Sequence, residues 1–214
     1  MSEIAKFIDD VIRRDLAKRL KSEGYRKSGR TFYSANDTRT AVVNVQASRN
    51  NFGDSGTFTI NCGVYFPDVA SITKAIPFTG RFPKEHNCTI RERIGRLMDG
   101  NDFWWPINSN TDFSSLAKDV ANTWALSGKP WIDRVSELDA AHTELVGQHQ
   151  YFVAAGISVL SGRRDEAIQL VHKAVDRKPR AADRIQDWAR QHKLICPDTR
   201  DNNAMDPNRR SDRF

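Results

Sequence analysis

An alternating residue pattern in residues 31–67 constrains the fold of this chain more than any other feature. Three short segments there repeat with a period of two and are separated by turn-forming residues. Such a pattern is typical of an antiparallel sheet with one buried face and one polar face. The apolar positions of the second and third segments are Ala41, Val43, Val45, Ala47, Phe58, Ile60, Cys62 and Val64.

The opposite face of this predicted sheet is rich in amides. Amide side chains have a weak preference for strands, so their place in the middle of two strands runs against local propensity. Such conflicts are expected where a residue has a functional role or belongs to a buried polar network. The alternative is an ordinary wet sheet face. The polar positions are Asn44, Gln46, Ser48, Thr59 and Asn61.

A second stretch adds arginines and tryptophans. Residues 88–94 alternate as a fourth strand, and residues 103–105 follow a Gly-Asn turn as the start of a fifth strand that Pro106 ends. Arginine beside aromatic residues is typical of protein-interface hot spots and also of surfaces that bind unpaired bases. In a third interpretation, both tryptophans are core residues and the arginines only flank them. If the tryptophans share a strand, we expect one to be buried and the other partly exposed. The residues concerned are Arg91, Arg93, Arg96, Trp104 and Trp105.

Helices are expected before and after the strand segments in the sequence. Apolar residues recur at helical spacing from the predicted N-cap Ser2 to Gly24, and this first helix is the expected cover of the apolar sheet face. A short helix is predicted over residues 68–76 and a longer one over 112–128. The fold class is therefore α+β, with an antiparallel sheet of four to five strands covered on one face by helices.

Composition changes after residue 128. Residues 1–128 are predicted to form the α+β sheet domain, 129–196 a C-terminal all-helical extension, and 197–214 a disordered tail with few apolar residues. Within the extension, small residues at 150–179 have offsets similar to those of a tetratricopeptide-type helical hairpin. One such unit cannot bury its own apolar face, so a hairpin that packs on the sheet domain explains the pattern equally well.

The net charge of +6 makes an acidic partner plausible, although a Lys/Arg-rich solvated surface gives the same value. On the first helix, Arg13, Arg14, Lys18 and Arg19 are candidate phosphate contacts, which is the nucleic-acid alternative. No apolar run is long enough to cross a membrane, and the N-terminus does not resemble a secretory signal. The odd number of widely spaced cysteines predicts reduced thiols and a cytoplasmic location.

No catalytic motif stands out. The sequence has no phosphate loop, no GxSxG or HExxH motif and no paired-cysteine zinc pattern, so we expect neither a metal site nor a cofactor. Cys62 falls on the apolar face and is expected to be a core residue. Glu85 and Glu92 bracket the fourth strand as candidate general bases, but a carboxylate near arginines also forms salt bridges.

Several separated motifs together resemble the bacterial domain-of-unknown-function family numbered 4304. They are EGYRKSGRTFY, VVNVQASR, FTINCGVYFP, RERIGRLM and the Trp pair, and the resemblance covers residues 7–131. It implies an α+β domain and no established activity. By analogy with small bacterial domains of toxin–immunity neighbourhoods, it implies a binding role.

We therefore expect a non-enzymatic binding protein that holds a protein partner on the polar sheet face, as an immunity-type or toxin-neutralising protein would. The predicted partner-binding residues are Asn44, Gln46, Asn61, Arg91, Arg93, Trp104 and Trp105. A nucleic-acid-associated module is the alternative, and an enzyme with a cleft on the polar face is a third hypothesis.

Overall fold

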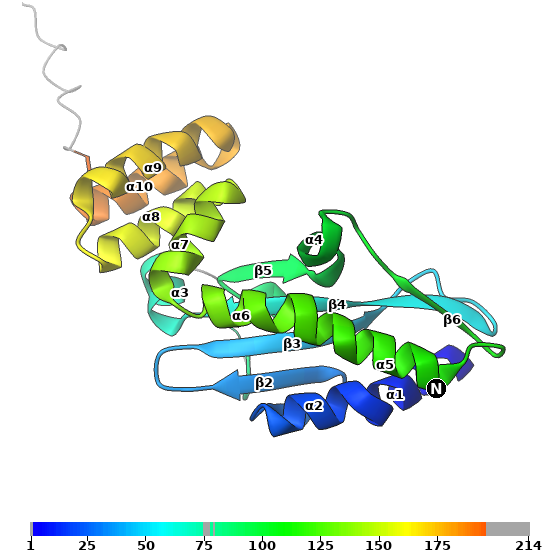
Figure 1. The fold of residues 1–214 in the computed structure, drawn as a ribbon. Helices are drawn as coiled ribbons and strands as arrows, with labels where there is room; N and C mark the ends of the chain where they lie inside the picture. Colours follow the sequence, from blue (N-terminus) through cyan, green and yellow to red (C-terminus); the bar gives the residue numbers. More distant parts are fainter. Residues whose placement is uncertain (1, 75–77, 79, 196–214) are drawn as a thin grey trace, which may run out of the picture.

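The structure is a computed structural model that describes residues 2–74, 78 and 80–195 (Figure 1). The predicted tail at 197–214, Cys196 and the predicted end of the helix at 68–76 lie outside the described residues. The helices are α1 (Glu3–Val11), α2 (Ala17–Ser22), α3 (Pro67–Ile72), α4 (Ile94–Asp99), α5 (Phe113–Thr123), α6 (Lys129–Val135), α7 (Leu138–Gly147), α8 (Tyr151–Leu160), α9 (Arg164–Arg177) and α10 (Ala182–Gln191). The strands are β1 (Arg26–Ser28), β2 (Thr31–Ala35), β3 (Thr40–Ala47), β4 (Ser55–Tyr65), β5 (Ile90–Arg93) and β6 (Trp105–Asn108).

The strands form one antiparallel sheet in the order β1-β2-β3-β4-β5, and β6 pairs with the beginning of β4. The predicted α+β fold is confirmed, and the described residues form six strands where the sequence predicted four to five. The strand that the sequence missed is β1, whose three residues are all exposed. The register places Asn44 opposite Asn61 and Asn61 opposite Arg93. Three neighbouring strands therefore carry polar residues on the same face.

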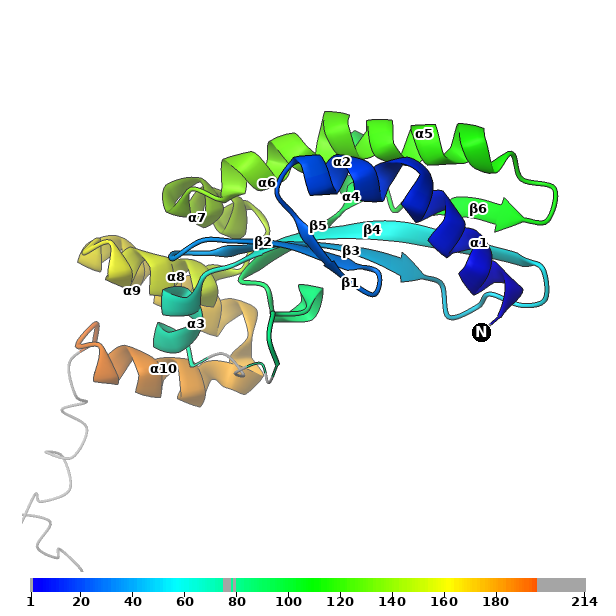
Figure 2. The same cartoon turned by 90° about the horizontal axis from the view of Figure 1, so that it is seen from below.

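Helices cover the other face of the sheet (Figure 2). The Ser2 hydroxyl accepts a hydrogen bond from the Ala5 amide and begins a helix that runs through a π-helical turn (Ile12–Leu16) to Ser22. Beside it lies a second long helix, α5 to α6, with a π-helical turn (Trp124–Gly128) between them. The apolar side chains of both helices join those of the sheet in a single core. The predicted cover by the first helix is thus present, and α5 adds a second one.

The amide-bearing face is covered only in part. Near β2, the ring of Phe82 stacks on Tyr33 with centroids 4.6 Å apart. Cys88 lies so close to Gly63 that a Cβ there would be 2.7 Å from its Sγ, which explains glycine at this position. The segment around Phe82 and Cys88 therefore covers one part of this face. In the other part, the side chains of Asn44, Gln46 and Asn61 are half-buried.

Two details differ from the sequence predictions. The fourth strand ends at Arg93, and residues from Ile94 onward form α4, which places Arg96 on a helix. Pro106 does not end the fifth strand. It lies inside β6, opposite Thr57, where proline is tolerated because β6 pairs on only one side.

The helical extension docks on the sheet domain at α3. The Trp188 indole of α10 donates a hydrogen bond of 2.6 Å to the Ile72 carbonyl. In α8, Gly156 lies against Thr73, and a Cβ at Gly156 would overlap the Thr73 methyl group. The helical run 113–135 continues through the predicted boundary at residue 128. The proposed division into two domains stays a prediction.

Candidate functional site

The polar face of the sheet carries a group of side chains that we call the amide–guanidinium surface: Asn44, Gln46, Asn61, Arg91, Arg93, Arg96, Asp102 and Trp104. A hollow of about 340 Å³ lies on it and is lined by Gln46, Asn61, Glu85, Arg91, Glu92, Arg93, Arg96 and Asp102. The sequence had predicted four residues of this lining as partner-binding positions: Gln46, Asn61, Arg91 and Arg93.

Hydrogen bonds join the surface across three strands. The Asn61 amide of β4 donates to the Gln46 carbonyl oxygen of β3 at 2.8 Å, and Arg93 of β5 donates from Nε to Asn61 Oδ1 at 3.4 Å. Asn44 donates to the Thr31 hydroxyl at 2.9 Å and lies at the rim. This order follows from the strand register, which sets Asn44, Asn61 and Arg93 side by side.

The Arg93 guanidinium is held on its other side by Asp102 and Trp104. Arg93 Nη1 donates to both Asp102 carboxylate oxygens, at 2.6 and 2.8 Å. The Trp104 indole donates to Asp102 at 3.1 Å, and its ring lies under the guanidinium at 4.9 Å. These two hydrogen bonds, from Arg93 and then from Trp104, hold the pKa of Asp102 below its usual value. The carboxylate is therefore charged at neutral pH.

Two other guanidiniums of the surface remain available. Within the described part of the chain, neither Arg91 nor Arg96 has a carboxylate oxygen within the 4.0 Å of a salt bridge, and both are exposed. Arg96 donates to the Gly100 carbonyl at 2.7 Å. The described lining of the hollow contains three arginines and the three carboxylates of Glu85, Glu92 and Asp102, so its formal charges balance.

The two tryptophans have different roles. Trp104 is half-buried at the surface, whereas Trp105 is 2 % exposed and stacks on Phe58 in the core with centroids 5.4 Å apart. The Trp105 indole donates to Asp119 at 2.7 Å. The structure therefore brings together all the predicted partner-binding residues except Trp105. Trp105 begins β6 and Trp104 lies in the loop just before it, so the two rings do not share a strand, although one is buried and the other is partly exposed.

The profile of one protein family, described as Domain of unknown function (DUF4304), matches residues 16–134. This is more than half of the chain. The chain belongs to the DUF4304 family. No curated protein and no solved structure matched the chain.

The DUF4304 segment contains the whole amide–guanidinium surface, from Asn44 to Trp104, and ends inside α6. The extension from α7 to α10 lies beyond it. Sequence reasoning did not assign Asp102 to the site, and it named Glu85 and Glu92 only as candidate general bases. The signal for Asp102 was weak: an acid two residues before a half-buried tryptophan, in a loop whose path no periodicity predicts.

The candidate nucleic-acid residues lie on the first helix of the DUF4304 structure. Arg13 and Arg14 both pair with Asp10, and Arg19 pairs with Glu23 at 3.3 Å. Lys18 lies beside Arg19 and Glu23 at a shallow hollow of the helix layer. Three of the four cations are thus already paired with carboxylates of their own helix.

Two cysteines of the described residues lie in surroundings that disfavour the thiolate. Burial raises the pKa of the Cys62 thiol, and it raises that of Cys88 to about 12, so both stay protonated and weakly nucleophilic at neutral pH. Among the described residues, no three His, Cys, Asp or Glu side chains come together as a metal site would require. The described part of the chain also contains no helix long and apolar enough to cross a membrane.

A Ser-His-Glu group lies inside the extension. Ser158 Oγ donates to Glu166 at 2.9 Å and lies 3.0 Å from His142 Nε2. A hydroxyl has one proton, so His142 must donate from Nε2 to Ser158 while Ser158 donates to Glu166. A base for catalysis would instead accept the serine proton. Ser158 is also fully buried, so this group links α7, α8 and α9 and offers no nucleophile.

This group predicts a pH dependence of stability. Burial lowers the pKa of His142 below its ordinary 6.5, against the opposing effect of the nearby Glu166 carboxylate. Arg163 also lowers the pKa of His142, and Asp139 raises it. The folded protein disfavours the protonated ring, so a lower pH decreases the free energy of unfolding. The contribution of neutral His142 to this free energy is fully present above about pH 6.5 and is lost as the pH falls through the pKa of the folded state.

We expect the melting temperature of the wild type to fall more between pH 7.5 and pH 5.5 than that of His142→Gln, by on the order of 2 °C. Thermal unfolding followed by circular dichroism measures both. His172→Gln, on the exposed side of α9, is the matched control and should keep the wild-type difference. Equal pH dependence of the wild type and His142→Gln would contradict the assignment.

Proposed function

We propose that this DUF4304 protein is a non-enzymatic binding protein that holds a protein partner on the amide–guanidinium surface. The observation that carries the proposal is the hydrogen-bonded row from Gln46 through Asn61 and Arg93 to Asp102. A row of this kind fixes polar side chains before a partner arrives, which lowers the entropy cost of binding. The amides and guanidiniums supply donors and acceptors in one place.

Two features favour a protein partner. Arg91 and Arg96 stand beside this ordered row without carboxylate partners among the described residues, and arginine is enriched at interface hot spots. Trp104 adds a half-buried aromatic ring at the rim. The partner would offer carboxylates or backbone carbonyls to the two arginines and polar groups to the amides.

The charge balance of the hollow separates this proposal from nucleic-acid binding. Affinity for nucleic acid comes mainly from an excess of positive charge that meets phosphates. Here three arginines face three carboxylates, and the basic first helix has most of its guanidiniums paired internally. The nucleic-acid alternative stays a prediction from the sequence. So do the bacterial origin, the cytoplasmic location and the toxin-neutralising role.

Partner capture tests the proposal. The full chain is immobilised and exposed to lysate of its source organism, and retained proteins are quantified for the wild type, Gln46→Ala/Arg91→Ala and Arg49→Ala. Arg49 is exposed at the β3–β4 turn, so its replacement removes one positive charge away from the surface. We expect a protein retained by the wild type and by Arg49→Ala, with affinity at least tenfold lower for the double variant.

Circular dichroism of each variant shows whether the fold is intact. The proposal fails if every retained protein binds the double variant as well as it binds the wild type. A captured toxin would also support the immunity-type role, and capture of an unrelated protein would remove that role while keeping the binding function.

A further inference from the structure

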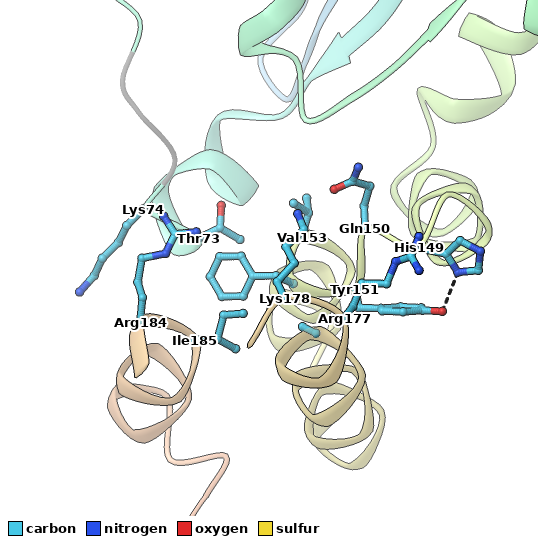
Figure 3. A pocket seen from close by; sticks show the side chains of 12 residues that line it. Thr73, Lys74, His149, Gln150, Tyr151, Val153, Arg177, Lys178, Arg184 and Ile185 are labelled. Carbon is cyan, nitrogen blue, oxygen red and sulfur yellow. Dashed lines mark hydrogen bonds between the residues drawn. The ribbon is translucent and has the colours of Figure 1, made fainter. Parts of the chain in front are cut away.

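A second cavity lies outside the amide–guanidinium surface, where the extension meets the end of α3. It has a volume of about 220 Å³ and is formed by residues that follow α3, by the start of α8, by the end of α9 and by α10. Figure 3 shows Lys74 and Arg184 on one side of it and His149 and Tyr151 on the other. Its lining is Thr73, Lys74, His149, Gln150, Tyr151, Phe152, Val153, Ala174, Arg177, Lys178, Arg184 and Ile185.

The charged residues of this lining are all cations. Among the described residues, Lys74, Arg177, Lys178 and Arg184 line the cavity, and no aspartate or glutamate does. In the described part of the chain none of the four forms a salt bridge, although Arg163 and Arg190 of the same extension do. Lys74 donates a hydrogen bond to the Gln191 side chain and contributes positive charge to the cavity. The side chains of Arg177, Lys178 and Arg184 can donate hydrogen bonds to a ligand.

Helix ends do not explain this set of cations. A cation at the end of α9 is favourable, and this accounts for Arg177 and Lys178. Arg184, however, lies in the first turn of α10, where the helix dipole disfavours a positive charge. Lys74 comes from a third segment, directly after the C-cap of α3.

The floor of the cavity is aromatic and apolar. The Phe152 ring packs on Trp188 with centroids 5.0 Å apart, and the Arg184 guanidinium lies 5.8 Å from the same ring. Tyr151 is half-buried, and its hydroxyl lies 2.7 Å from His149 Nδ1. The cavity thus offers apolar contact for a ring next to guanidinium and ammonium groups for an anion.

We propose that this cavity binds a small phosphate ester that carries a single ring. A phosphate monoester carries about −1.5 to −2 charge at neutral pH and suits several cations better than a single carboxylate does. The cavity is below the roughly 300–1,000 Å³ of sites for drug-sized ligands, which limits the ligand to about one phosphate and one ring. The site is independent of the proposed partner surface and lies mainly outside the DUF4304 segment.

Phenyl phosphate is the simplest probe with both parts, and isothermal titration calorimetry on the full chain measures its binding. Inorganic phosphate and phenol each carry one of the two parts. We expect phenyl phosphate to bind at least tenfold more tightly than inorganic phosphate and phenol to give no measurable heat. Arg177→Gln and Arg184→Gln should each lower the affinity for phenyl phosphate at least tenfold.

Arg180→Gln is the matched control, because Arg180 is exposed between these two arginines and does not line the cavity. The affinity of this variant for phenyl phosphate should stay within twofold of the wild-type value. The proposal is overturned if phenyl phosphate does not bind at low ionic strength, or if inorganic phosphate binds as tightly. It is also overturned if Arg180→Gln weakens binding as much as the cavity variants do.

Discussion

Gly95→Ala is expected to lower the free energy of unfolding by about 2–3 kcal/mol. Gly95 lies in α4, and a Cβ there would overlap the Phe103 backbone nitrogen and approach the Asn101 carbonyl oxygen to 2.6 Å. Both neighbours are backbone atoms and have no side-chain rotation with which to move away. In an unobstructed helix the same change would stabilise the protein by up to about 1 kcal/mol, so a loss of stability is diagnostic of the close approach.

The loop that Gly95 contacts cannot move freely. The Phe103 carbonyl accepts a hydrogen bond of 2.9 Å from the buried Thr59 hydroxyl, and Trp105 pairs with Phe58 in the sheet. The same loop carries Asp102 and Trp104, so Gly95→Ala should also weaken partner binding at the amide–guanidinium surface.

Urea unfolding followed by circular dichroism measures the effect of Gly95→Ala. Gly147→Ala is the matched control, because Gly147 ends α7 and a Cβ there meets no atom within 4 Å. We expect this control to change stability by no more than about 1 kcal/mol, in the stabilising direction. Similar midpoints for Gly95→Ala and the wild type would show that the helix and loop do not approach as closely as described.

The second large effect is expected at the contact between the extension and the sheet domain. Gly156→Ala places a methyl group against the Thr73 Cγ2 atom and should destabilise the docked arrangement by about 1–3 kcal/mol. The next atom of another residue is Ile72 Cγ2 at 3.4 Å, which is ordinary contact. A single methyl group therefore accounts for the overlap.

Thr73→Ser removes that methyl group and keeps the hydroxyl, which donates to the Val69 carbonyl at 2.6 Å. In the double variant Gly156→Ala/Thr73→Ser, most of the loss from Gly156→Ala should be recovered, with a coupling of about 1–2 kcal/mol. Urea unfolding of the wild type, both single variants and the double variant completes the cycle. Hydrogen exchange in α8 and α10 should rise in Gly156→Ala alone.

A strictly additive cycle would contradict the direct contact between Gly156 and Thr73. Faster exchange in α5 and in α8 alike would indicate general loss of the fold and not separation of the extension.

The sheet and its two faces were predictable from the sequence because side chains of a strand alternate between faces. A period of two therefore identified Val43, Ile60 and Cys62 as core residues and Asn44, Gln46 and Asn61 as their polar counterparts, and the structure places them so. The expectation for Trp104 and Trp105 assumed a shared strand, whereas Trp104 lies in the loop before β6 and its position depends on that loop. The family resemblance is confirmed over residues 16–134.

The placement of some site residues could not be predicted from any periodicity of the sequence. Asp102 reaches Arg93 from the loop after α4, and Glu85 reaches the hollow from a 3₁₀ turn (Glu85–Asn87). Both positions depend on the path of irregular segments, which tertiary contacts decide. α4 starts at Ile94, and the next residue, Gly95, lies directly against the same loop, a contact between segments that no sequence period predicts.

The sequence by itself determined the α+β class, the antiparallel sheet and the polar face, because local alternation and helical spacing are properties of neighbouring residues. Only the tertiary structure decided which charges are paired and which remain available. Arg13 and Arg14 share one carboxylate, whereas Arg177 and Arg184 line a cavity to which the described residues contribute none. The physical reason is that the energy of a charge depends on the groups within a few ångströms of it, and those groups come from distant parts of the chain.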